Sequence, residues 1–159
     1  MLSYLHAYHA GNHADIIKHI VLSEVIRYMK NKDKPITFID THSGSGFYNV
    51  TDPRACKTGE ATKGIIRLVE NKNTIEDSIK SISDYLSYAE EYLKDGYYPG
   101  SPYIEADNLR NSDTLILSEL HPAEYENLKM NMQEKIKVKK DWCKISVHKQ
   151  NGFKVLESM

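Results

Sequence analysis

The sequence predicts an α/β fold with a mostly parallel sheet. Two apolar runs suit short buried strands, ITFI at 36–39 and TLILSEL at 114–120, and a third strand is predicted at 145–148. Helical patterns lie before, between and after these runs. Because strands that alternate with helices are joined by crossovers, this order favours a parallel sheet, whose ligands bind beyond the carboxyl ends of its strands.

The first half of the chain begins with the clearest helical pattern, at 14–31. Its apolar residues recur at helical spacing and predict one buried face, formed by Ile16, Ile17, Ile20, Val21, Val25, Ile26 and Met29. Pro35 separates this helix from the strand at 36–39. Residues 51–59 have the composition of a loop. Two further helices are expected, at about 60–71 with Gly64 inside it and at 74–94, where Thr74 and Asp77 fit a helix start.

The second half predicts a simpler alternation. GYYPGSP at 96–102 reads as a turn-rich loop, with a short helix after Pro102. The strand at 114–120 leads to a helix at 122–134 that starts with Pro122. After the strand at 145–148, the last seven residues predict the start of another helix. We expect one domain over 1–159, with a helical insertion at about 52–96, since a crossover normally needs only one helix.

Composition narrows the functional class. The 159 residues carry a net charge of −1 with 27% charged residues, so a basic face for nucleic acid could exist only as a local patch. The lysine run at 135–144 is interpreted as a solvated face. Cys56 and Cys143 make no disulfide framework and indicate a reducing compartment. The sequence has no zinc-type Cys/His spacing, no signal peptide and no membrane-length apolar run, so we expect a cytoplasmic protein without a metal or membrane partner.

Polar residues at three strand ends are the candidates for ligand binding: DTHSGSG at 40–46, ELH at 119–121 and NG at 151–152. The glycine loop lacks the third glycine of a dinucleotide-binding fingerprint, which disfavours an NAD-dependent enzyme. Glu119 suits the two hydroxyls of a ribose, Asn151 an adenine edge, and Asp40 the amino group of a methionine moiety. This set favours S-adenosylmethionine over a pyrophosphate cofactor, with a purely structural turn as the alternative.

Two other local patterns have weaker interpretations. Ser45 lies between glycines, but Ser43 stands where the nucleophile frame G-x-S-x-G needs its first glycine, so a hydrolase is disfavoured. His9 and His13 are four residues apart without a third ligand, so we expect no metal there.

Four sequence blocks in this order, HAGNHADIIKH, FIDTHSGSG, YYPGSP and LSELHP, resemble the bacterial 23S ribosomal RNA adenine-N6 methyltransferases. That family was earlier described as involved in the catabolism of external DNA. The resemblance covers essentially the whole chain. It implies a Rossmann-like methyltransferase fold that uses S-adenosylmethionine, with an inserted helical subdomain.

The resemblance also implies roles for particular residues. Cofactor-binding positions of the family match His19, His42, Ser101 and Glu119, and its third-strand Asp-Gly pair aligns with Asn151-Gly152. Asparagine in place of aspartate keeps a hydrogen-bonding partner for adenine and loses the charge. Tyr4 matches a family aromatic that meets the substrate RNA.

One family feature is missing from this sequence. Amino-methyltransferases of this kind carry an Asp/Asn-Pro-Pro-aromatic motif after their fourth strand, and here no two prolines are adjacent. We therefore expect the N-terminal, cofactor-binding part of an enzyme that acts on 23S rRNA as a monomer when complete, with no catalytic residue in this chain. The alternative is a non-catalytic binder of S-adenosylmethionine or nucleic acid, linked to the use of external DNA.

Overall fold

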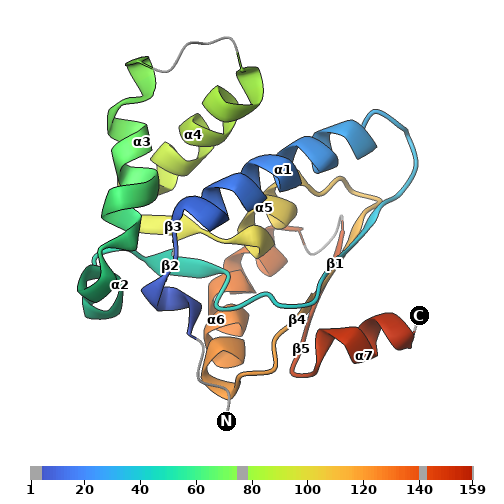
Figure 1. Cartoon of the computed structure of the whole chain (residues 1–159). Coiled ribbons are helices and arrows are strands. Elements are labelled where there is room, and N and C mark those ends of the chain that lie inside the picture. The colour runs from blue at the N-terminus through green and yellow to red at the C-terminus, as the bar shows by residue number, and fades with distance from the viewer. Residues whose placement is uncertain (1–4, 75–78, 140–142, 159) are drawn as a thin grey trace.

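The structure, a computed structural model, describes residues 5–74, 79–139 and 143–158. A three-stranded parallel sheet holds the strands in the order β1 (Thr37–Asp40), β4 (Thr114–Ser118) and β5 (Lys144–His148). Asp40 is level with Leu117, and Ser118 with His148, so the carboxyl ends of the three strands lie at one edge. The predicted α/β fold with a parallel sheet is confirmed (Figure 1).

Helix α1 (His13–Met29) differs from the predicted pattern in the face it buries. Ile16 and Ile26 are buried, but Ile17, Val21 and Val25 are 65%, 56% and 48% exposed. Helix α1 packs on α4 (Lys80–Leu93), α5 (Ser101–Asn108) and the turn η2 (Thr62–Ile66). Successive residues are rotated by about 100° around a helix axis, so these partners do not cover the whole of one broad apolar stripe. The inward side instead includes Asp15 and His19, both buried.

The described residues between 50 and 96 are mostly helical, with bounds that differ from the prediction. It contains α2 (Pro53–Thr58), a π-type turn η2 (Thr62–Ile66), α3 (Arg67–Glu70), a 3-10 turn η3 (Lys72–Thr74) and α4 (Lys80–Leu93). The predicted loop at 51–59 is therefore wrong. Asp52 caps α2 by accepting a hydrogen bond from the Arg54 N–H at 2.8 Å. The sequence contains this capping residue, but the helix after it is too short to show a helical period.

The helix predicted at 60–71 is interrupted at Gly64, whose backbone leaves helical geometry. A Cβ at this position would lie 2.2 Å from the carbonyl oxygen of Gly11, and the Ile65 N–H donates to that same oxygen at 2.9 Å. The approach of the N-terminal segment thus requires glycine here. The predicted start of α4 is also wrong, since the Thr74 hydroxyl donates to Asn71 and the helix begins at Lys80; Asp77 lies outside the described residues.

A short antiparallel pair was not predicted. β2 (Phe47–Asn49) pairs with β3 (Tyr97–Pro99). β3 lies inside the segment 96–102, which was expected to be a loop. Strands of three residues are too short to show a period in the sequence. Because this pair closes the base of the helical segment, we propose it as the boundary of the insertion expected at about 52–96. Figure 1 shows α3 and α4 at the opposite end of the molecule from α7 (Gly152–Glu157).

The remaining helices follow the prediction more closely. α5 (Ser101–Asn108) packs on β1 and β4, α6 (Pro122–Lys139) extends past its predicted end, and α7 (Gly152–Glu157) contacts β4. The lysine run is not simply solvated. Lys135 pairs with Asp107 and lies 4.8 Å from the ring centre of Tyr103, and Lys139 donates to the Leu109 carbonyl.

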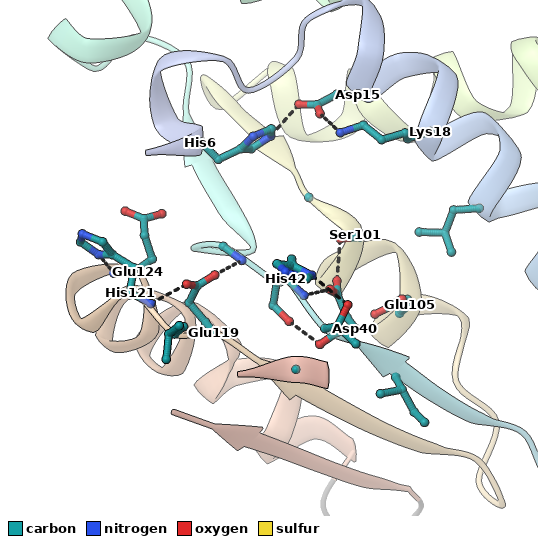
Figure 2. A pocket seen from close by; sticks show the side chains of 18 of the residues that line it. His6, Asp15, Lys18, Asp40, His42, Ser101, Glu105, Glu119, His121 and Glu124 are labelled. Atoms are coloured by element: carbon teal, nitrogen blue, oxygen red, sulfur yellow. Dashed lines mark hydrogen bonds and ion pairs between the residues drawn. The ribbon is translucent and has the colours of Figure 1, made fainter. Parts of the chain in front are cut away.

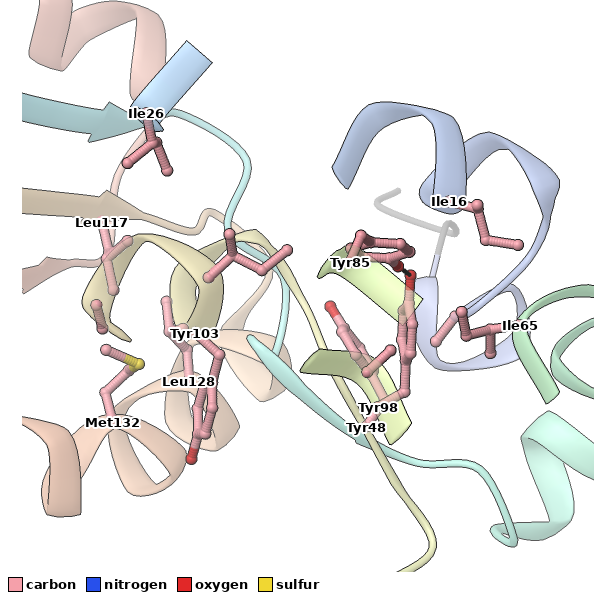
Figure 3. Close-up of a cluster of buried hydrophobic side chains, with 14 of the residues drawn as sticks. Ile16, Ile26, Tyr48, Ile65, Tyr85, Tyr98, Tyr103, Leu117, Leu128 and Met132 are labelled. Atoms are coloured by element: carbon pink, nitrogen blue, oxygen red, sulfur yellow. Dashed lines mark hydrogen bonds between the residues drawn. The ribbon is translucent and has the colours of Figure 1, made fainter. Parts of the chain in front are cut away.

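The core joins the parallel sheet to the helical insertion. Figure 3 shows Leu117, Leu128 and Met132 near the sheet, and Tyr85 and Tyr98 toward the insertion; the first three and Tyr98 are completely buried. The Tyr85 and Tyr98 hydroxyls are 2.8 Å apart, so these buried polar groups satisfy each other. Among the described helices, none has the length and apolar character needed to cross a membrane.

Candidate functional site: a cavity at the strand ends

A cavity of about 790 Å³ opens where β1 and β4 end, bordered by the N-terminal ends of α5 and α7 and by one side of α1. This volume suits a small organic ligand. Its position, beyond the carboxyl ends of parallel strands, is the one expected for a ligand site in an α/β fold. Figure 2 shows labelled side chains from α1, from α5 and from the ends of β1 and β4 around the same space.

The glycine loop is fastened to the neighbouring strand by Glu119. One carboxylate oxygen of Glu119 accepts the Gly44 N–H at 2.8 Å, and the other accepts the His121 N–H at 2.7 Å. Gly44 has a φ of +57°, and a Cβ on it would lie 2.3 Å from the Tyr48 hydroxyl. Only glycine fits this bend, so the loop backbone borders the cavity without a side chain in the way.

Asp40 occupies the floor of the cavity at the end of β1. Its carboxylate accepts hydrogen bonds from the Ser101 hydroxyl at 2.7 Å and from the His42 N–H at 3.0 Å. Burial raises the pKa of Asp40, and these two hydrogen bonds act in the opposite direction by stabilising the charged form. The bond to Ser101, the first residue of α5, ties that helix to the strand end.

The α1 side of the cavity carries a charged cluster. Asp15 is 1% exposed and lies 2.8 Å from His6 and 3.0 Å from the Lys18 ammonium. Burial raises the pKa of Asp15, but hydrogen bonds from His6 and Lys18 and the charges of His6 and His19 outweigh it and bring the pKa to about 2. Asp15 therefore remains ionised at neutral pH and holds both partners at the cavity, as Figure 2 shows.

His19 lies deeper on the same helix face. Its Nδ1 is 2.8 Å from the Tyr98 hydroxyl and 3.4 Å from that of Tyr85, and its ring stacks on Tyr98. Burial lowers the pKa of His19 to about 4, although the charge of Asp15 acts in the opposite direction. The imidazole is therefore neutral at pH 7 and fixed in orientation by the tyrosines, while it still lines the cavity.

The third strand end contributes Asn151 and Gly152. The Asn151 side-chain oxygen caps α7 by accepting the Phe153 N–H at 3.0 Å, which leaves its amide N–H groups for a ligand. A Cβ on Gly152 would lie 2.2 Å from the carbonyl oxygen of Thr41. Gly152 thus permits the close contact between the start of α7 and the loop after β1.

The residues predicted from sequence converge on this one cavity. Its lining includes His19, His42, Ser101, Glu119, Asn151 and Gly152. Tyr4 lies outside the described residues. His42 is exposed and lies edge-on to Phe153, with ring centres 5.3 Å apart.

Further lining residues were not predicted: His6, Asp15, Lys18, Tyr48, Glu105 and Glu124. A signal existed for two of them, because Asp15, Lys18, His19 and Leu22 recur at the spacing of one helix face. For Glu105 and Glu124 the sequence offers no comparable pattern.

The weaker patterns have structural roles. The Ser45 hydroxyl donates to Glu124 at 2.7 Å, and both residues are buried. His9 lies 2.8 Å from Glu60. Within the described parts of the chain, no three His, Cys, Asp or Glu side chains are grouped to hold a metal ion.

Comparison with known proteins connects this geometry to a family. Over 99% of its length the chain is 38% identical to ribosomal RNA large subunit methyltransferase J of Escherichia coli (strain K12), and 39% identical to the protein of the same name in Haemophilus influenzae. It spans about half of these relatives, 54% of each. A crystal structure of a Legionella pneumophila DUF519 protein superposes with a TM-score of 0.78 and 33% identity, over 94% of this chain and 52% of that one.

The sequence profile that matches this chain extends over residues 33–159, which include β1, β4 and β5 and most of the cavity lining. Together with the relatives, this match also establishes the Rossmann-like methyltransferase-type fold. The chain belongs to the family described as ribosomal RNA large subunit methyltransferase D, RlmJ.

Proposed function

We propose that this chain forms the S-adenosylmethionine-binding half of an enzyme that methylates the N6 amine of an adenine in 23S ribosomal RNA. The observation that carries the proposal is the meeting of three strand ends at one cavity, where the glycine loop, Glu119 and Asn151 lie together. The family contributes the reaction class. The choice of S-adenosylmethionine as the methyl donor rests on the chemistry of the cavity and on the resemblance of the sequence blocks. The choice of adenine N6 as the target atom rests on that resemblance.

The polar groups that line the cavity match the parts of S-adenosylmethionine. Each Glu119 oxygen accepts one backbone N–H and has lone-pair capacity left for a ribose hydroxyl. The Asn151 amide can donate to a ring nitrogen of adenine. Asp40 and Ser101 lie on the floor, where they suit the polar amino-acid end of the ligand. The neutral His19 is compatible with a cationic sulfonium nearby, because it adds no positive charge.

The chain's own residues would bind and orient the methyl donor. S-adenosylmethionine supplies an electrophilic methyl group, so the transfer to an amine needs no metal. Fixing the reactants in line is a large part of the rate in such a step, about 7–11 kcal/mol at its best. The glycine loop after β1, held by its hydrogen bonds to Asp40 and Glu119, would provide that orientation on the donor side.

The rim of the cavity suits an RNA backbone. The Lys18 side chain is 65% exposed and its ammonium is held by Asp15 at 3.0 Å. A fixed, solvent-facing cation next to the donor site can contact a phosphate and help to position the flipped base. The resemblance adds Tyr4 as a contact to the substrate RNA.

The acceptor side of the reaction is not supplied by this sequence. The target amine needs hydrogen-bond acceptors and a stacking surface, which related enzymes provide with an Asp/Asn-Pro-Pro-aromatic motif. No two of the five prolines here are adjacent. We therefore assign transfer to a protein of about the relatives' full length, in which this chain corresponds to 54%.

Two experiments test the proposal. Calorimetric titration of the chain with S-adenosylmethionine, S-adenosylhomocysteine and NAD should give saturable binding of the first two only. In addition, residues 1–159 can replace the matching segment of the E. coli relative, and the chimera can be incubated with unmodified 23S rRNA. We expect adenine N6 methylation that Glu119→Ala reduces. NAD binding, or a folded chimera that binds RNA and donor without methylating adenine, would contradict the proposal.

A further inference from the structure

Glu105 is a buried carboxyl without an obvious structural purpose. It is 6% exposed on α5 and lines the cavity. Its Oε2 atom is buried and has no hydrogen-bond partner among the described residues. Leaving such a group unsatisfied costs free energy in the empty protein, so its retention in a ligand cavity points to a partner that arrives with the ligand.

The surroundings of Glu105 define what that partner must be. Ser101 and Glu105 are four residues apart on α5 and therefore share one helix face. Figure 2 shows both beside Asp40, to whose carboxylate the Ser101 hydroxyl donates at 2.7 Å. Burial and the negative charge of Asp40 raise the pKa of Glu105 well above its usual range. Two carboxyl groups that destabilise each other's charge create a place for a cation.

The number of acceptors favours an ammonium group over a metal ion. A primary ammonium has three N–H donors. The part of the cavity around Asp40 offers three oxygen-bearing side chains, those of Asp40, Ser101 and Glu105. Divalent cations need more ligands, and the described residues contain no group of three His, Cys, Asp or Glu side chains that could hold one.

We propose that Glu105 and Asp40 together bind the primary ammonium of an amino-acid moiety, and that Glu105 makes the cavity selective for ligands that carry this group. This inference rests on the proposed function, because it concerns the amino-acid end of the methyl donor. It adds a binding residue that the sequence did not indicate. The carboxylate of Glu105 would contact the ligand directly.

The test compares two ligands that differ in the amino-acid moiety. S-adenosylhomocysteine carries the ammonium, and 5′-methylthioadenosine retains the adenine, ribose and thioether but lacks the amino acid. Affinities for both are measured by calorimetry with the wild-type chain, with Glu105→Gln, and with Glu126→Gln as a control. Glu126 is exposed on α6 and outside the cavity lining, so its substitution makes the same chemical change away from the ligand.

We expect Glu105→Gln to weaken S-adenosylhomocysteine binding about tenfold or more, as for the loss of a charge-assisted hydrogen bond, and to leave 5′-methylthioadenosine binding within about twofold. Glu126→Gln should change neither. In the absence of ligand, thermal unfolding of Glu105→Gln should occur at the same or a higher temperature than that of the wild type. If Glu105 only shapes the cavity, its substitution should instead lower the melting temperature and weaken the binding of both ligands.

The outcomes separate this inference from the proposed function. If the wild type binds S-adenosylhomocysteine and Glu105→Gln leaves that affinity unchanged, or weakens both ligands equally, the ammonium site is wrong and the proposed function stands. If the wild-type chain binds neither ligand, the proposed function fails and the inference falls with it.

Discussion

The Glu119 carboxylate accepts a hydrogen bond from the backbone N–H of Gly44 at 2.8 Å, across 75 positions of the sequence. This contact joins the end of β4 to the loop after β1. The side chain proposed to receive the ribose hydroxyls therefore also holds the loop that borders the ligand. Binding and preorganisation depend on the same group.

Replacing Glu119 should accordingly weaken the binding of the methyl donor strongly. For Glu119→Ala we expect a loss of about 1.5–3 kcal/mol in the free energy of S-adenosylmethionine binding, the range for a hydrogen bond to a charged group. Glu119→Gln keeps one acceptor oxygen and should lose less. Calorimetry measures both, with Glu126→Gln as the surface control. Equal affinity of Glu119→Ala and wild type would show that the carboxylate does not touch the ligand.

Gly152 should be intolerant of any side chain. A Cβ there would lie 2.2 Å from the Thr41 carbonyl oxygen, so Gly152→Ala must push α7 away from the loop after β1. We expect a loss of about 1–3 kcal/mol in the free energy of unfolding, as for overpacking, together with weaker donor binding. Urea denaturation and calorimetry measure the two effects.

Gly59 provides the matched control for this substitution. It ends α2 with a φ of +64°, and a Cβ on it would meet nothing within 4 Å. Gly59→Ala should cost about 1 kcal/mol of stability through its left-handed backbone and leave donor binding intact. If both alanine variants bind the donor like the wild type, the contact between Gly152 and Thr41 does not shape the cavity.

His19 should make the stability of the protein depend on pH. Burial lowers its folded-state pKa to about 4 from 6.5, so between these values the unfolded chain binds a proton that the folded chain does not. Stability must then fall as the pH is lowered through this window. From pH 7 to pH 5 the expected loss is about 2 kcal/mol in the free energy of unfolding.

Urea denaturation at a series of pH values measures this loss. His19→Gln removes the titrating group and should flatten the dependence between pH 7 and pH 5. His13→Gln, at an exposed position on the same helix, should leave it unchanged. An identical pH dependence in His19→Gln and wild type would mean that the imidazole is not held neutral in the folded state.

The parallel sheet was predictable because its signals are local. Short runs rich in apolar residues between helical patterns identify β1 and β4, and the residues just after them identify the strand ends. The cavity residues there, such as Asp40 and Glu119, follow from topology alone. Any parallel sheet brings its carboxyl ends together.

What the sequence could not show depends on long-range packing. Val21 and Val25 match the apolar period of α1, yet they are exposed, because the contacts with α4 and α5 decide which face turns inward. The β2–β3 pair is held by residues about 50 positions apart and is too short for a period. Glu105 resembles any helix glutamate, and only the fold places its carboxyl in the cavity.

The last prediction is that the 159-residue chain binds the methyl donor but does not methylate RNA by itself. The three strand ends supply the donor side, whereas the adenine amine needs acceptors and a stacking surface that no Pro-Pro motif in this sequence provides. Without them, the orientation of the nucleophile is lost, and with it most of the catalytic advantage of about 7–11 kcal/mol that alignment can give. The measurement is incubation of the folded chain with tritiated S-adenosylmethionine and unmodified 23S rRNA, next to the chimera with the E. coli relative as a positive control. Label at an adenine N6 above the no-protein level, from the chain alone, would overturn this prediction and place an acceptor for the amine protons among its own residues.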